Sequence, residues 1–332
     1  MVSITSAQGI ENCFWPVAKS QRDLVKIVDD SVSVIATADE AQSKRRRLRI
    51  KYGAEYFALR GLVGFLHILP LDLASWSMGL AWRLIAPYLN RHKRALRHLA
   101  TAYPDKSDAQ LEAIAREMWM QLGRTFAESL MIERISRAGR IDDRTGALLD
   151  PLKDAGRGIV FVSLHTGNWE LAITPTIVRE IKAAGIYQRM KNPKVDDYVA
   201  LARRDRYPRG LFAKGTVAAR RLLRVVREGG SVAMLADLRD RRGIVVPFFG
   251  QPAPSSTFPA LLCRSSEAVL VAARTIRSGG VHFRIEAQEV KVPRTDDREA
   301  DIAEATRQIH ALFEQWVREH PEQWMWAHRR WG

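Results

Sequence analysis

A short apolar run that ends in a histidine is the feature that most restricts how this chain can fold. Residues Ile159–Leu164 read Ile-Val-Phe-Val-Ser-Leu, as expected of a strand that is buried on both faces of a parallel sheet. The residues that follow, His-Thr-Gly-Asn-Trp-Glu, include types that favour turns and helix N-caps. His165 is therefore expected at the carboxyl end of a strand, where open α/β sheets bind their ligands.

The spacing between His165 and Glu170 restricts how their side chains can meet. On one continuous helix, residues five apart point about 140° away from each other, so the pair can meet only if His165 lies in the turn before the helix. A carboxylate beside an imidazole fixes the tautomer and tunes the pKa, as a general base requires. A histidine next to an acid is also a common structural pair, but the position at a strand end favours the catalytic interpretation.

A second polar residue follows a buried strand. The run Gly229–Asp237 reads as a turn and then an apolar strand that ends at Asp237. This carboxylate is therefore expected at the same edge of the sheet as His165, and helix capping is the alternative role. The sequence leaves open whether Glu170 or Asp237 orients the imidazole.

Strand and helix patterns alternate along residues 107–332 and predict one α/β domain. A capping box, Ser107 with Gln110, begins a helix that should run to about Ile135. Glu128 of this helix could face a site, but an exposed position is the expectation. The remaining pattern predicts strands over Ile186–Met190, Ile244–Gly250, Val269–Thr275 and Val281–Ala287, and helices over Val195–Arg206, Thr216–Glu228 and Asp301–Glu319.

The amino-terminal part combines a basic run, Ser43–Lys51, with the most apolar long segment of the chain, Tyr56–Leu89. This segment has no clean run of about 20 apolar residues to span a bilayer, because it is interrupted by Arg60, Pro70, Asp72 and Arg83. One interpretation is two core helices joined at the proline. The neighbouring basic run favours the other, an interfacial element on an anionic membrane.

Three regions are therefore predicted: an extension of uncertain order over residues 1–50, an apolar helical membrane-associating region over 51–106, and the α/β domain over 107–332. The net charge of +15 suits nucleic acid, an anionic membrane surface or a phosphorylated substrate. Nucleic acid is not expected, because zinc-finger spacing and an RNA-recognition signature are absent from the sequence. Two cysteines without a nucleophile signature, and no secretory-signal pattern at the amino terminus, predict exposure to the cytosol.

Five blocks of the sequence, in order, resemble the bacterial lipid A acyltransferases. The hexapeptide His165–Glu170 fits their H-x-x-x-x-D/E signature. Three further blocks are Asn90–Ser107, Tyr187–Arg206 and Gly229–Ser256, the last of which carries D-x-x…G-x-x-V-x-F-F-G. The fifth, Pro321–Trp331, resembles the closing Pro-Glu-Gln-aromatic-x-Trp-x-His-x-Arg pattern. Together these blocks extend the resemblance over nearly all of residues 50–332.

The resemblance implies a mixed central sheet flanked by helices, similar to that of glycerolipid acyltransferases. It implies acyl transfer from an acyl carrier protein to a hydroxyl of a lipid A precursor, at the cytoplasmic face of the inner membrane, without a metal or a bound cofactor. His165 would be the general base, held by Glu170 or Asp237. The acceptor would be a phosphorylated glycolipid, whose phosphates and carboxylates suit basic side chains. Those implied to bind it are Arg189, Arg204, Arg206 and Lys214.

Two alternatives remain open. Related enzymes with the same motif acylate other glycolipids, such as phosphatidylinositol mannosides. A protein of a different class, a non-catalytic membrane-binding protein, would use only the basic run and the apolar segment. The presence of both His165 and Glu170 favours an enzyme.

Overall fold

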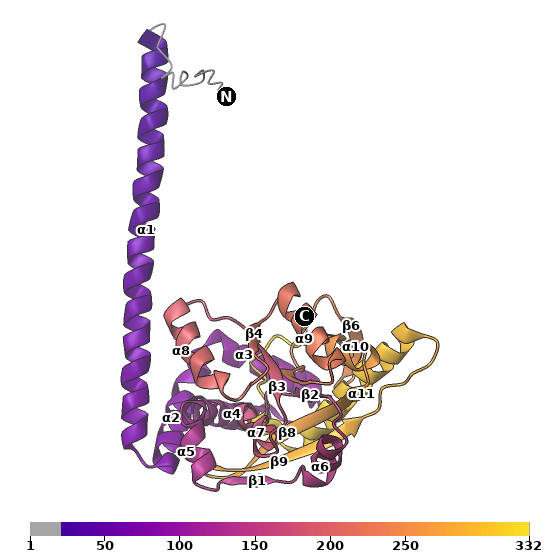
Figure 1. The fold of residues 1–332 in the computed structure, drawn as a ribbon. Coiled ribbons are helices and arrows are strands. Elements are labelled where there is room, and N and C mark those ends of the chain that lie inside the picture. The colour runs from indigo at the N-terminus through magenta and orange to yellow at the C-terminus, as the bar shows by residue number, and fades with distance from the viewer. Residues whose placement is uncertain (1–20, 332) are drawn as a thin grey trace, which may run out of the picture. The chain divides into compact units, whose positions relative to one another are not determined.

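The computed structural model describes residues 21–331, with side chains from residue 42 onward (Figure 1). The chain divides into two compact units, Met1–Tyr56 and Phe57–Gly332. Most of helix α1, which spans Gln21–Ile68, belongs to the first unit. Within the predicted extension over residues 1–50, residues 21–50 are therefore helical, whereas residues 1–20 lie outside the described part.

The second unit is built on a seven-stranded sheet with the order β1-β9-β8-β2-β5-β3-β4. The five strands from β8 to β4 in that order run parallel, and β9 runs antiparallel to β8 and parallel to β1. The prediction of a mixed central sheet is confirmed. The strands are β1 Ile141–Asp143, β2 Ile159–Ser163, β3 Ala183–Tyr187, β4 Leu211–Ala213, β5 Ser231–Leu235, β8 Val269–Gly279 and β9 His282–Val290, beside a separate antiparallel pair, β6 Ile244–Phe248 and β7 Gln251–Ser255.

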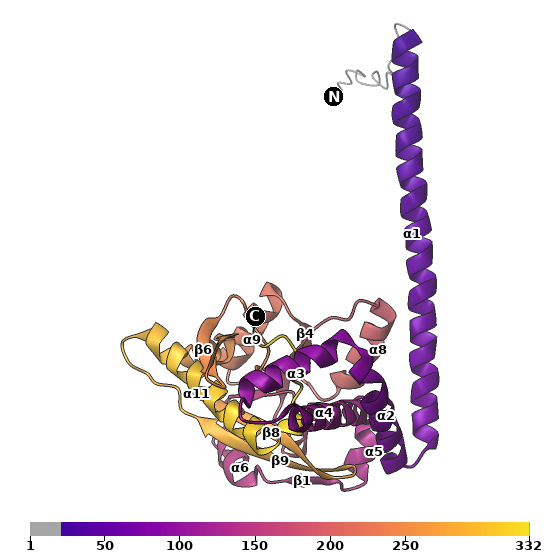
Figure 2. The ribbon, with the colours of Figure 1, turned by 180° about the vertical axis from the view of Figure 1, so that it is seen from behind.

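Helices cover both faces of this sheet, because alternate residues of a strand point to opposite faces. Val160 and Val162 of β2 pack into one core cluster with residues of α4, α10 and α11, while Ile159 and Phe161 pack into another with Leu149 of α6. Figure 2 shows α3, α4 and α11 on the near side. The helices are α2 Leu71–Ile85, α3 Asn90–Ala102, α4 Asp108–Ser129, α5 Ile132–Arg137, α6 Gly146–Asp154, α7 Thr174–Val178, α8 Pro193–Arg204, α9 Thr216–Arg227, α10 Phe258–Arg264 and α11 Arg298–Glu319, with 3-10 turns η1 Ala86–Tyr88, η2 Trp169–Leu171 and η3 Pro321–Gln323.

Several predicted elements have different bounds in the structure, and for two of them the packing explains the difference. The capping box at Ser107 is present, but the helix that it begins ends at Ser129, and α5 is a separate helix after a short turn. The buried residues of α5 pack into a different core cluster from most of α4, which explains the break. Strand β3 begins at Ala183 rather than at Ile186. Its first residues are alanines, which weaken the apolar pattern, and Gly185, whose lack of a side chain lets the strand pass the Tyr207 ring.

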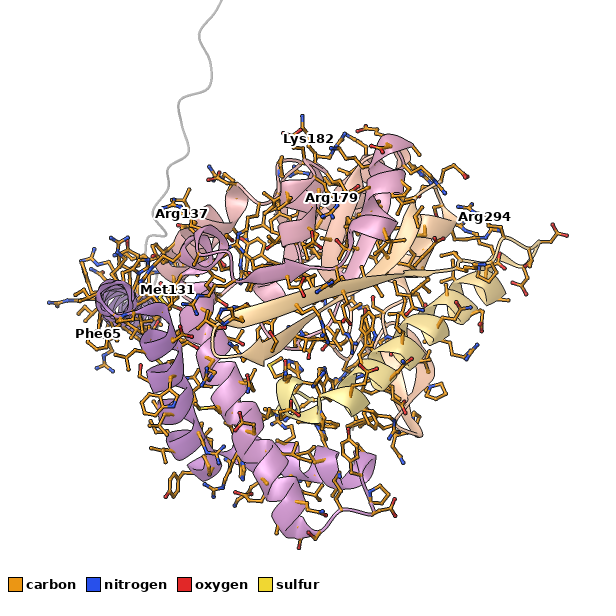
Figure 3. All side chains as sticks on the ribbon, turned by 90° about the horizontal axis from the view of Figure 1, so that it is seen from below. Phe65, Met131, Arg137, Arg179, Lys182 and Arg294 are labelled. Carbon is orange, nitrogen blue, oxygen red and sulfur yellow. The ribbon has the colours of Figure 1, made fainter. Side chains whose placement is uncertain are left out.

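Pro70 separates α1 from α2, as the interpretation of two joined helices predicted. Helix α2 packs closely on α4, since a Cβ atom on Gly123 would lie 2.5 Å from the Met78 carbonyl oxygen. Figure 3 labels Phe65, near the end of α1, and Met131. The Phe65 side chain is exposed, whereas the Met131 side chain is buried in a core cluster. Among residues 21–331, no helix is both long enough and apolar enough to cross a membrane.

Candidate active site

His165 and Asp237 meet because two neighbouring strands end in register. Strands β2 and β5 are parallel, and Ser163 pairs with Leu235. His165 and Asp237 each lie two residues beyond that pair, at the carboxyl edge of the sheet. The His165 Nδ1 atom lies 2.7 Å from Oδ1 of Asp237, and the His165 backbone N–H donates to Oδ2 at 2.9 Å. A carboxylate can only accept these bonds, so Nδ1 carries the proton and the lone pair of Nε2 is left to accept one.

The surroundings of Asp237 keep its carboxylate charged. Asp237 is 1% exposed, and Oδ2 also accepts a hydrogen bond from the Trp324 indole at 2.8 Å. Burial by itself would raise the pKa of Asp237, but the positive charge that His165 carries when protonated, together with the hydrogen bonds from His165 and Trp324, holds that pKa well below its usual range. The site therefore contains a histidine held by a buried carboxylate.

The turn that carries His165 is held by the carboxyl-terminal segment of the chain. Gly167 has φ of 53°, and a Cβ atom there would lie 2.2 Å from the Thr275 carbonyl oxygen, so the turn requires glycine. The Gly167 N–H donates to the Gln323 carbonyl at 3.2 Å, and the Met325 N–H donates to the His165 carbonyl at 3.2 Å. The segment that contains Trp324 therefore fixes both the turn and Asp237.

Glu170 lies in η2 and does not take the position beside His165 that the sequence motif suggested. Its carboxylate pairs with the Arg203 guanidinium, whose Nε atom lies 3.0 Å from Oε2 and whose Nη2 atom contacts Oε1. Arg206 adds a bond of 3.3 Å from Nη1 to the Glu170 carbonyl. Among the described residues, the carboxylate that orients His165 is Asp237. Of the two carboxylates that the sequence left open, the one that contacts the imidazole is Asp237, and Glu170 is bonded to Arg203 instead.

The basic residues that the family resemblance singled out differ in their surroundings. Arg189, Arg204 and Lys214 are exposed, so they are free to meet a ligand from solvent. Arg206 instead contacts Glu170, and burial lowers the pKa of its guanidinium. Arg203 was not among the predicted residues. Neighbouring positions on a helix point about 100° apart, so Arg203 and Arg204 lie on different faces. The run Ala-Arg-Arg-Asp-Arg does not show which of these faces is turned toward the site.

Two aromatic residues flank the imidazole and were also missed. The Trp169 ring lies edge-on, 5.0 Å from the His165 ring, and the His328 ring stacks on it at 5.9 Å and 26°. Burial and the nearby charge of His165 lower the pKa of His328 to about 4, so His328 is neutral near pH 7. Its Nδ1 atom is buried without a hydrogen-bond partner. The only sequence signal for His328 was its place in the closing block.

Glu128 contradicts the expectation that it is exposed. It is fully buried and pairs with Arg277 of β8, with Nη2 lying 2.8 Å from Oε2. The sequence pattern of α4 did not predict the burial of Glu128, because a carboxylate is rarely buried without a charged partner. That partner can come from a distant part of the chain. Here β8 supplies that partner.

The described residues contain no cluster of three or more histidine, cysteine, aspartate or glutamate side chains placed to hold a metal ion. A cavity of about 620 Å³ lies between Gly158, Val226 and Arg264, at the opposite ends of the strands from His165. We define the candidate site by the His165–Asp237 geometry and not by this cavity.

Comparison with known proteins gives a family. Residues 40–332 match the family described as bacterial lipid A biosynthesis acyltransferase. A lipid A biosynthesis myristoyltransferase of Escherichia coli and a lipid A biosynthesis acyltransferase 1 of Shigella flexneri are each 27% identical over 245 residues, which is 70% of this chain and 73% of theirs. A phosphatidylinositol mannoside acyltransferase of Mycobacterium tuberculosis is 27% identical over 229 residues, 63% of this chain and 67% of its own. The chain belongs to the bacterial lipid A biosynthesis acyltransferase family.

Proposed function

We propose that this protein transfers a fatty acyl chain from an acyl carrier protein to a hydroxyl of a lipid A precursor. The observation that carries the proposal is the His165–Asp237 pair at the carboxyl edge of the sheet, in a chain of this family. A neutral imidazole whose Nδ1 proton faces a buried carboxylate presents Nε2 as a base. A protein that only bound membranes would not need this arrangement.

In the proposed reaction, Nε2 of His165 takes the proton of the acceptor hydroxyl while the hydroxyl oxygen attacks the thioester carbonyl carbon. The new carbon–oxygen ester bond forms, the carbon–sulfur bond breaks, and the leaving thiolate takes the proton back from the imidazolium. Asp237 stabilises the positive charge on the imidazolium, as the carboxylate of a serine protease triad does, but here without a protein nucleophile. General-base catalysis of this kind typically contributes about 10²–10⁴-fold.

The exposed basic residues Arg189, Arg204 and Lys214 are proposed to bind the phosphates and carboxylates of the acceptor. Arg203 and Arg206 have another part in this proposal, since both contact Glu170. They fix the segment that follows the His165 turn. The net charge of +15 also suits an acidic acyl carrier protein and an anionic membrane surface.

We further propose that the protein works at the cytoplasmic face of the inner membrane, held at the interface and not spanning it. Apolar side chains on α2 and just beyond it are exposed, among them Trp76, Leu84, Ile85 and Tyr88. Solvent-exposed basic residues lie on α1 over residues 44–51. Apolar and basic groups of this kind favour the surface of an anionic bilayer.

Acylation of a phosphatidylinositol mannoside is the second candidate. It is favoured by the similarity to the M. tuberculosis enzyme, which at 27% identity is as similar to this chain as the lipid A enzymes are. The same dyad would deprotonate a mannose or inositol hydroxyl. The two candidates therefore differ in the acceptor and not in the chemistry.

The test is a transfer assay with purified protein and a radiolabelled acyl group on an acyl carrier protein. A phosphorylated disaccharide lipid and a phosphatidylinositol mannoside are offered separately as acceptors. We expect label in the first lipid, and its loss in a His165→Ala protein. A His282→Ala protein is the matched control, because His282 is an exposed histidine of β9. Label in the mannoside alone would select the second candidate, and normal transfer by a folded His165→Ala protein would rule out the mechanism.

A further inference from the structure

A buried polar network lies directly behind the turn that carries His165. Glu128 Oε1 accepts hydrogen bonds from Ser75 at 2.6 Å and from Nη1 of Arg277 at 2.5 Å. Glu128 Oε2 accepts from Nη2 of Arg277 at 2.8 Å and from the side-chain amide of Asn168 at 3.2 Å. All four residues are buried. Through Asn168, the carboxylate of α4 contacts the turn itself.

The same face of α4 makes a second bond to the turn. Thr125 lies three residues before Glu128, so both project from one side of the helix. The Thr125 hydroxyl donates to the Gly167 carbonyl at 2.8 Å. Residues 165–168 have no regular secondary structure. The direction of His165 therefore depends on its own bonds to Asp237, on these side-chain bonds and on the bonds from the carboxyl-terminal segment.

Arg277 connects the network to the other side of the dyad. Its backbone N–H donates to the Gln323 side chain at 2.8 Å, and its carbonyl accepts from that side chain at 3.1 Å. Gln323 precedes Trp324, whose indole binds Asp237. The ion pair of Glu128 and Arg277 is thus bonded to the turn of His165 and to the segment that holds Asp237.

We infer that Thr125, Glu128 and Arg277 are positioning residues that align the His165–Asp237 pair. None of them touches the reacting atoms in the proposed mechanism. A buried ion pair is a poor source of stability, because desolvation of the two charges offsets their attraction, and a well-packed apolar pair of similar volume is often as stable. Misplacement of a catalytic group by about 1 Å can cost about 10²-fold in rate. The network therefore serves geometry, and this inference rests on the proposed acyl transfer.

Two double variants separate positioning from stability. In Glu128→Gln/Arg277→Met, both charges are gone, but the glutamine oxygen still accepts the bond from Asn168. In Glu128→Leu/Arg277→Met, the charges are gone and that acceptor is gone as well. We expect the first protein to keep more of the wild-type kcat than the second, because the acceptor for Asn168 is still present. The second should lose about 10- to 100-fold in kcat with an unchanged KM for the acceptor.

Thr125→Val is the third variant, and it keeps the experiment decisive if the leucine variant does not fold. It removes one bond to the turn and leaves the ion pair intact. Its control is Thr306→Val, because Thr306 is equally buried but bonds only to its own helix, at the Ile302 carbonyl. We expect similar Tm values for the two valine variants, with kcat lowered only in Thr125→Val.

The failure of this inference differs from the failure of the proposed function. If the wild-type protein transfers no acyl chain, the proposed function has failed. If the wild-type protein is active and Thr125→Val has the same kcat as Thr306→Val, the positioning role is wrong. Equal kcat values for folded leucine and glutamine double variants would overturn it as well.

Discussion

The two carboxylates near His165 differ in what they bind. Asp237 is buried against the imidazole and the Trp324 indole, whereas Glu170 is bonded to Arg203. Substitution of Asp237 should therefore act on the proton transfer. Substitution of Glu170 should act through the arginine and the segment that it fixes.

Asp237→Asn should lower kcat by about 10²–10⁴-fold, because an amide has one acceptor atom where the carboxylate has two and does not stabilise an imidazolium. The measurement is steady-state kinetics at saturating donor and acceptor. Asp296→Asn, at an exposed aspartate, serves as the control and should behave as wild type. A folded Asp237→Asn protein with kcat within about threefold of wild type would contradict this role.

Glu170→Gln and Arg203→Met should not have additive effects. Each change breaks the same charged pair, so the double variant should be little worse than the worse single variant. Residues in contact show coupling energies of about 0.5–3 kcal/mol. A double-mutant cycle on kcat/KM for the acceptor measures the coupling. Additivity within about 0.3 kcal/mol would show that the pair does not act as a unit in turnover.

At the scale of secondary structure elements, α2 has two different faces. One face packs closely on α4, where Gly79 of α2 lies against Gly123 of α4. The other face, with the η1 turn that follows, exposes apolar side chains to solvent. Exposed apolar side chains on one side of a helix are expected to contact a protein or a membrane. The basic residues of α3, Arg91, Lys93 and Arg97, are exposed just after it in the chain.

A triple variant, Leu84→Ser/Ile85→Ser/Tyr88→Ser, should bind vesicles that contain anionic phospholipid at least about 10-fold more weakly than wild type, since less apolar area enters the interface. Vesicle co-sedimentation measures the binding. The control, Val217→Ser/Val245→Ser, removes exposed apolar side chains from other elements. Equal loss of binding in both proteins would show that the α2–η1 surface has no special part.

At the scale of the whole molecule, several histidines are buried as neutral groups. Burial lowers the pKa of His310 to about 3 and that of His328 to about 4, and the pKa of His98 is lowered as well. The unfolded chain binds protons at these sites near the ordinary value of 6.5, while the folded chain does not. Above about pH 6.5 these groups are neutral in both states, and as the pH falls below that value their protonation increasingly favours the unfolded state.

The free energy of unfolding should fall between about pH 6.5 and pH 4, by about 3 kcal/mol for each of His310 and His328. Urea unfolding at a series of pH values measures it. His328→Gln should reduce the slope, whereas His67→Gln, at an exposed histidine, should not. An unchanged slope in His328→Gln would mean that His328 is protonated in the folded state.

Local pattern was enough to predict several elements. The apolar run before His165 became β2, the Ser107 capping box begins α4, and Pro70 separates α1 from α2. The motif blocks predicted the family, which the comparison confirms. These features depend on residues close together in the chain, where dihedral preferences and apolar spacing act directly.

Only the tertiary structure decided which side chains meet. The register of β2 with β5 brings Asp237, 72 residues away, to His165. The orientation of α8 directs Arg203 to Glu170, and β8 supplies the partner that allows Glu128 to be buried. These contacts join residues far apart in sequence, and their geometry depends on strand register and helix packing. Local pattern names the candidate residues of such a site, and packing of distant elements selects among them.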